Sequence, residues 1–80
     1  MEWKIIEGRL QRGFEFQDFK EAVNFVNRIL PLAEKMNHHP NIFIHSYNKV
    51  KIILFTHEEN KVTEKDNILA SKIDGLTNYN

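Results

Sequence analysis

Apolar and polar residues alternate through much of the first sixteen positions, which is the pattern of half-buried strands. Residues 3–6 are apolar and β-prone, Glu7 and Gly8 give a turn signal, and a second alternating segment covers residues 10–16. In that segment the more apolar set of alternating residues consists of Leu10, Arg12, Phe14 and Phe16. The pattern predicts a β-hairpin with one face in the core.

From Asp18 the spacing of apolar residues changes to steps of three and four, which is typical of an amphipathic helix. Asp18 can cap its first turn. Pro31 lies inside the helix and lacks a backbone donor, so we expect a kink there. We expect the helix to end at His39, because the residue before Pro40 favours extended backbone. The apolar stripe consists of Phe19, Ala22, Val23, Val26, Ile29, Leu30 and Ala33.

Two further strands are predicted at residues 42–47 and 49–56, joined by a tight turn near Asn48. On the second strand one face carries Val50, Ile52 and Leu54, and the other carries Lys51, Ile53, Phe55 and His57. Ile53 and Phe55 make this other face partly apolar as well. We therefore expect something to cover it, such as another subunit.

The last predicted element is a helix that begins after the polar loop 58–62. Thr63 and Asp66 have the spacing of a capping-box pair. An apolar side containing Leu69 and Ile73 follows, and Gly75 is placed to end the helix. The predicted order is β-β-α-β-β-α. This order favours an α+β fold, an antiparallel four-stranded sheet with two helices packed on one face, in a single domain spanning residues 1–80.

Composition narrows the class of protein. The 80 residues contain 11 Lys plus Arg, 11 Asp plus Glu and no cysteine, which gives a net charge of zero with neutral histidines. No positive field would attract nucleic acid, and disulfides and thiolate metal ligands are excluded. No apolar run approaches the roughly 20 residues that span a bilayer, and no signal peptide is evident. We expect a soluble, cytoplasmic protein that binds neither nucleic acid nor membrane.

Three of the four histidines fall at the predicted ends of elements, where loops can form a cleft on a rigid scaffold. His38 and His39 end the long helix, and His57 ends the fourth strand. If the helix continues to His38, Glu34 lies on the same face and can orient its imidazole. Asn37 is suited to cap the helix end.

Ordinary structural roles compete for the other candidates. His45 follows the alternation of its strand and is expected to be structural or merely exposed. Asp66 has an evident role as a helix cap, which makes it a weaker candidate for a reactive carboxylate. Tyr47 is first of all a sheet residue that could also line a pocket.

The order and spacing of these residues resemble a known family. The run 34–40, Glu-Lys-Met-Asn-His-His-Pro, followed by Tyr47, His57 and Asp66, is similar to the signature of the pterin-4a-carbinolamine dehydratases. Three short segments are also similar to that family: Tyr-Asn-Lys-Val at 47–50, Thr-His-Glu at 56–58 and Leu-Ala-Ser-Lys-Ile-Asp at 69–74. The resemblance extends from Trp3 to about Leu76.

The resemblance implies an enzyme that removes water from a 4a-hydroxytetrahydropterin and gives the quinonoid dihydropterin, without metal or redox cofactor. His38, His39 and His57 become the active-site histidines, with Glu34 and Asp66 in support. We expect His38 and His57 to exchange protons with the substrate, while His39, helped by Tyr47, holds the pterin. Glu34 would orient His38, and Asp66 would shape the His57 loop.

The resemblance also implies a homodimer or homotetramer in which sheets join between subunits. Relatives usually carry a further N-terminal segment, often helical, which is expected to be absent here. Two other hypotheses remain open. Glu34, His38 and His57 could instead be ligands of zinc or another divalent ion. The chain could also be a non-catalytic binding module or a transcriptional dimerisation cofactor, like some animal relatives.

Overall fold

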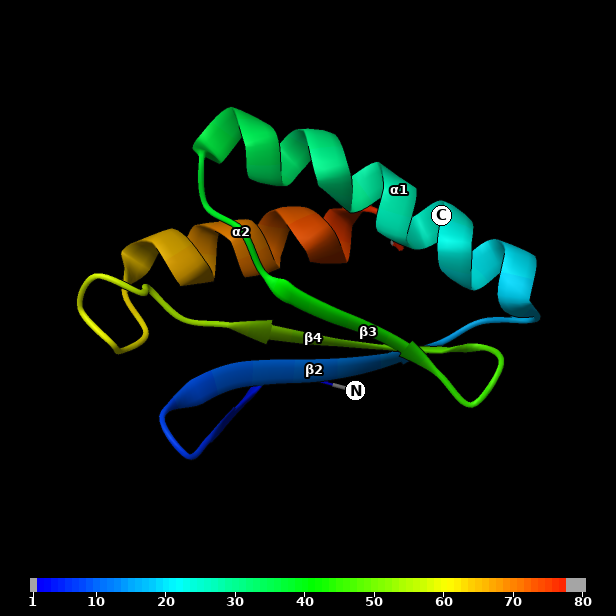
Figure 1. Ribbon diagram of the computed structural model, residues 1–80, viewed down its shortest axis with the longest axis horizontal. Coiled ribbons are helices and arrows are strands. Elements are labelled where there is room, and N and C mark those ends of the chain that lie inside the picture. Colours follow the sequence, from blue (N-terminus) through cyan, green and yellow to red (C-terminus); the bar gives the residue numbers. More distant parts are fainter. Residues whose placement is uncertain (1, 78–80) are drawn as a thin grey trace.

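Six elements follow one another in the predicted order in the computed structural model, which describes residues 2–77 (Figure 1). The α+β class is confirmed, and the predicted strand boundaries lie within about two residues of the observed ones. The strands are β1 (Lys4–Ile6), β2 (Arg9–Glu15), β3 (Asn41–His45) and β4 (Lys49–Leu54), and the helices are α1 (Phe19–Met36) and α2 (Glu64–Gly75).

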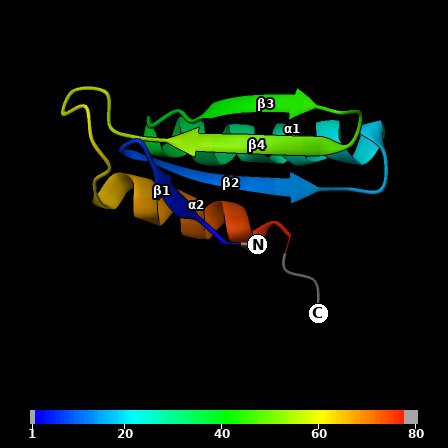
Figure 2. The same cartoon turned by 90° about the horizontal axis from the view of Figure 1, so that it is seen from below.

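The four strands form one antiparallel sheet in the order β1-β2-β4-β3. Leu10 lies opposite Leu54, and Ile42 lies opposite Ile52, so the apolar parities of three strands share one face. Both helices cover this face, as Figure 1 shows. Figure 2 looks onto the opposite face, which no element within residues 2–77 covers, and we call it the open face.

The core lies between the sheet and the two helices. Ile29, Val50, Ile52, Leu69 and Ile73 have no exposed surface. Burying a side chain of this size stabilises the fold by about 1.5–3 kcal/mol. Leu10, Phe14, Ala22, Phe25, Leu54 and Ala70 complete the buried cluster.

The amino end of α1 has a reciprocal cap. Oδ1 of Asp18 accepts the backbone N–H of Glu21 at 2.9 Å, and Oε1 of Glu21 accepts the backbone N–H of Gln17 at 2.9 Å. The predicted start of the helix is therefore confirmed. The helix then continues through Pro31 as one element.

We expect Asp18→Ala to lower the free energy of unfolding by about 1 kcal/mol, because an N–H in the first turn loses its acceptor. Urea unfolding followed by circular dichroism measures this change. Asp18→Asn is the matched control, since its amide oxygen can still accept the bond and should restore most of the stability. An alanine variant as stable as the wild type would show that the cap contributes nothing.

The carboxyl end of α1 differs from the prediction. The helix ends at Met36, and Asn37 adopts the left-handed conformation with φ 52° and ψ 44°. Its backbone N–H and that of His38 return to the carbonyl groups of Ala33 and Glu34, which satisfies the last turn. Asparagine tolerates this conformation better than most residues, so Asn37 ends the helix before the restriction imposed by Pro40 can act.

Trp3 connects β1 to α2. Its indole Nε1 donates to both carboxylate oxygens of Asp74, at 2.9 and 3.0 Å, and Arg12 contacts the same carboxylate at 2.6 Å. The Arg12 guanidinium also lies 4.3 Å from the centre of the Phe14 ring. This cluster fastens the first strand to the last helix. Among residues 2–77, neither helix is long and apolar enough to cross a membrane.

Candidate active site

The ends of four secondary-structure elements meet at one end of the molecule. The end of α1, the start of β3, the end of β4 and the start of α2 all lie there in both Figure 1 and Figure 2. His38 and His39 lie between α1 and β3, and His57 follows β4. The topology therefore brings the two predicted histidine segments to the same end of the sheet, where connecting segments can form a site.

His38 is buried and bonded to a carboxylate. Its Nε2 lies 2.6 Å from Oδ1 of Asp66, and the side chains are 8% and 0% exposed. Because a carboxylate only accepts hydrogen bonds, Nε2 of His38 is the donor and carries a proton. Asp66 thus fixes both the tautomer and the orientation of the imidazole.

Asp66 also accepts two further hydrogen bonds. Its Oδ2 receives the hydroxyl of Thr56 and the backbone N–H of Thr63, each at 2.9 Å. The Thr63 contact confirms the predicted role of Asp66 as part of a helix cap. The contact with His38 adds a second role. Thr56, which the sequence analysis missed, could have been found from its parity with Leu54, since this parity points into the core.

Glu34 bonds to His39 and not to His38. Its Oε2 lies 2.7 Å from Nε2 of His39, and the side chains are 64% and 55% exposed. The expected pairing of Glu34 with His38 is therefore wrong. The physical reason is the left-handed turn at Asn37, which ends the helical spacing and directs His38 inward while His39 stays at the surface.

His57 stays outside this buried network. It is exposed, and the centre of its ring lies 4.2 Å from that of Phe55. Among residues 2–77, neither of its ring nitrogens has a hydrogen bond, and no hydrogen bond joins any two of the three histidines. One carboxylate nevertheless links the two segments, because Asp66 contacts both His38 and Thr56, the neighbour of His57.

The structure does not bring Tyr47 to this site. Tyr47 lies in the turn between β3 and β4 and is 64% exposed. Strand β3 leads away from the histidine end, so its length separates Tyr47 from His39 by on the order of 15 Å. His45, at the end of β3, is exposed and contacts Ser46 at 3.0 Å, as expected for a residue without a site role.

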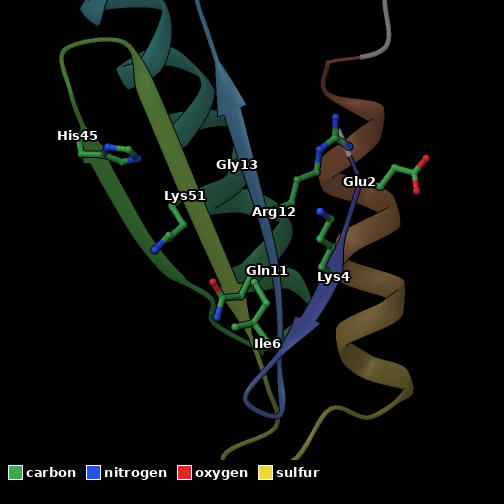
Figure 3. Close-up of a pocket in the computed structure, with 8 residues that line it drawn as sticks. All are labelled: Glu2, Lys4, Ile6, Gln11, Arg12, Gly13, His45 and Lys51. Atoms are coloured by element: carbon green, nitrogen blue, oxygen red, sulfur yellow. The ribbon is translucent and has the colours of Figure 1, made fainter.

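Two cavities bear on where a ligand could sit. One of about 320 Å³ lies on the open face and includes Lys4, Arg12 and Lys51. Figure 3 shows Lys4 and Lys51 on either side of β2 and Arg12 turned toward α2, so these polar groups do not converge on one point. The other, of about 260 Å³, lies between α1 and β3. It includes His39 and Pro40 and is otherwise largely apolar.

A metal centre finds no support in the geometry. Within residues 2–77, no group of three or more histidine, aspartate and glutamate side chains is arranged to hold an ion. The alternative ligand set Glu34, His38 and His57 is not assembled, because Glu34 turns to His39 and His38 to Asp66.

Comparison with known proteins gives a consistent family. The family model described as pterin 4 alpha carbinolamine dehydratase matches residues 1–76. A relative from Sulfurisphaera tokodaii is 47% identical over 74 residues, which cover 92% of this chain and 78% of the relative. One from Paraburkholderia xenovorans is 48% identical over 77 residues, covering 94% and 79%. Their names assign both provisionally as pterin-4-alpha-carbinolamine dehydratases.

Solved structures show the same fold. A Brucella melitensis protein described as a transcriptional coactivator/pterin dehydratase matches with a TM-score of 0.88 and 37% identity, over 95% of this chain and 82% of that one. A pterin dehydratase-like protein, described as a RuBisCO assembly factor in the α-carboxysome, matches with a TM-score of 0.81 over 100% and 94%. At 22% identity, the second likeness shows the fold alone.

Proposed function

Because this chain belongs to the pterin-4a-carbinolamine dehydratase family, we propose that it removes water from a 4a-hydroxytetrahydropterin by histidine acid–base catalysis. The observation that carries the proposal is the pair of carboxylate-bound imidazoles, His38 with Asp66 and His39 with Glu34, at the end of the molecule where β4 leads into the segment of His57. These are five side chains of the family pattern.

The reaction requires one proton donor and one proton acceptor. The bond between C4a and its hydroxyl oxygen breaks, and a donated proton lets the oxygen leave as water. A ring nitrogen loses a proton, and its electron pair forms the new double bond to C4a. No electrons are gained or lost, so a redox cofactor has no part in the step. Imidazole can both give and take a proton near neutral pH.

We assign proton exchange to His39 and His57, whose side chains are exposed and can meet a ligand. His38 is 8% exposed and its Nε2 is occupied by Asp66, which suits a residue that shapes and holds the site. This division differs from the one expected from the sequence, where His38 was a proton-exchanging group. Its support is the burial of His38.

The cavity beside His39 supports a place for the pterin. Its volume of about 260 Å³ is close to the lower limit of ligand pockets, about 300 Å³, and its apolar lining can receive one face of a flat ring. A pterin placed there would have the imidazole of His39 at its edge.

We further propose that the product enters recycling of a tetrahydrobiopterin-type cofactor, in which a reductase acts on the quinonoid dihydropterin. The expectation of a homodimer or homotetramer stays a prediction, and exposed Phe43 and Ile44 on the edge strand β3 are consistent with it. The cytoplasmic location also stays a prediction.

A non-catalytic binding role is the second candidate, because the Brucella melitensis protein is described as a coactivator as well as a dehydratase. The turnover test separates the two. We expect the wild-type protein to accelerate the conversion of a freshly generated 4a-hydroxytetrahydropterin to the quinonoid dihydropterin, followed by absorbance in buffer with a chelator. The control is the same reaction without protein. A rate equal to this spontaneous rate would overturn the enzymatic proposal and favour the binding role.

A further inference from the structure

Three side chains form a stack on the open face next to the candidate site. The guanidinium carbon of Arg9 lies 3.7 Å from the centre of the Phe55 ring. The imidazole of His57 packs on the same ring, with a centroid distance of 4.2 Å and an interplanar angle of 34°. Phe55 thus contacts both a cation and His57, one of the two exposed histidines of the site.

The sheet register sets one of the two contacts in this stack. Gln11 pairs with Ile53 in the antiparallel ladder of β2 and β4, so the register continued by two residues sets Arg9 opposite Phe55. Phe55 directly follows β4, and His57 lies two residues later at the start of the turn 57–60, where its ring contacts that of Phe55. Strand register therefore sets the contact of Arg9 with Phe55, and the turn that follows β4 sets the contact of His57 with Phe55.

Arg9 also holds the loop that follows His57. Its Nη2 donates to Oδ1 of Asn60 at 2.8 Å. The backbone N–H of Asn60 donates to the carbonyl oxygen of His57 at 3.2 Å, and Thr56 bridges to Lys61 across the base of the loop. Arg9 therefore restrains the His57 segment at two points, through the Phe55 ring and through Asn60.

The three histidines are held in two different ways. In His38 and His39, Nε2 is occupied by a carboxylate. In His57, the support reaches the face of the ring, and among residues 2–77 no hydrogen bond uses its nitrogens. A ring held by its face keeps Nδ1 and Nε2 available to give or take a proton.

We propose that Phe55 and Arg9 are positioning residues for His57, orienting its imidazole for proton exchange through stacking in place of a carboxylate. The proposal rests on the dehydratase function proposed above. An imidazole without this support would rotate about its side-chain torsions, and a misplacement of about 1 Å can cost on the order of 10²-fold in rate.

The test combines proton NMR with kinetics on Phe55→Leu, which keeps an apolar side chain but removes the ring. In the wild type, the ring protons of His57 should resonate upfield of those of His45, because they lie over an aromatic face. In Phe55→Leu they should move downfield toward the His45 values. We expect kcat to fall about 10- to 100-fold with a smaller change in KM.

Two variants serve as controls. Phe55→Tyr keeps an aromatic ring and should retain both the upfield shift of the His57 signals and the wild-type kcat. Phe19→Leu removes an exposed aromatic residue at the opposite end of α1 and should change neither.

Arg9→Lys is a second test of the stack. It keeps the charge but loses the planar group that stacks, so it should change both readouts in the direction of Phe55→Leu.

Each result has a distinct meaning. His57 ring signals that stay in place in Phe55→Leu would show that the stack does not hold the imidazole. A moved His57 signal with unchanged kcat would show that this orientation does not serve catalysis. A wild-type protein that shows the upfield signal but no turnover would overturn the dehydratase function and the catalytic purpose of the stack, while the stack itself would stand.

Discussion

Replacement of His57 by alanine is expected to lower kcat/KM by about 10²- to 10⁴-fold, the range that positioned acid–base groups contribute. His39→Ala should fall in the same range. Both side chains are exposed, and both residues belong to the segments that join the converging element ends, so truncation removes a proton-exchanging group without opening a cavity in the core. Steady-state turnover of a 4a-hydroxytetrahydropterin measures the loss.

His45→Ala is the matched control, because His45 is an exposed histidine at the other end of β3. It should keep the wild-type rate. Circular dichroism spectra of all three variants should match that of the wild type. Their free energies of unfolding, from urea titrations, should lie within about 0.5 kcal/mol of the wild-type value, as is typical of surface substitutions. Wild-type turnover in both His39→Ala and His57→Ala would contradict the assigned roles.

Replacement of Asp66 by alanine is expected to lower the free energy of unfolding by about 3–5 kcal/mol, the cost of removing one partner of a buried ionic or strongly polar pair. Asp66 is fully buried and accepts bonds from His38, Thr56 and Thr63. The alanine variant leaves Nε2 of His38 and the backbone N–H of Thr63 without this acceptor, while the Thr56 hydroxyl keeps a partner in Oγ1 of Thr63 at 2.6 Å. Native proteins have a total stability of about 5–15 kcal/mol, so at the lower end of this range part of the population would unfold.

Urea unfolding monitored by circular dichroism measures this loss, and two variants divide it among the bonds. Thr56→Val removes one donor while keeping the shape, so it should cost about 1–3 kcal/mol. Asp66→Asn keeps an oxygen acceptor but presents N–H groups on its other arm, and should fall between the wild type and Asp66→Ala. An Asp66→Ala variant as stable as the wild type would show that the buried network contributes nothing to stability.

The two carboxylate–imidazole pairs therefore have different consequences. The pair of His39 with Glu34 is more than half exposed, and surface pairs contribute about 0–1 kcal/mol. Its proposed role is to orient His39. The pair of His38 with Asp66 is buried and joins α2 to the end of α1, so it supports the fold as well as the site.

Much of the fold could be predicted because its signals are local. The period of two in residues 10–16 and 49–54, and the steps of three and four after Asp18, depend only on neighbours along the chain. The start of α1 was predicted for the same reason, since a cap involves residues within one turn. The strand order β1-β2-β4-β3 was not predicted, because it depends on which distant edges meet.

The sequence predicted that the three histidine positions share one end of the molecule, but it did not predict the contacts that their side chains make. His38, His39 and His57 lie next to element ends that meet at one end of the molecule, as expected from the sequence. The partner of Glu34 was wrong because one residue, Asn37, leaves the helical conformation and changes the direction of all that follows. Tyr47 was placed in the site by family pattern alone, and the length of β3 separates it from the histidines within this chain.

The sequence by itself determined the elements, their order, the core faces and the family. Tertiary structure alone decided that Asp66 bonds to His38, 28 residues away, and that Arg9 lies over Phe55. The physical reason is that hydrophobic periodicity reports which face of an element is buried, whereas a hydrogen bond or a stack depends on where two elements lie relative to each other. That placement follows from strand register and from the backbone angles of single residues such as Asn37, which apolar patterning does not encode.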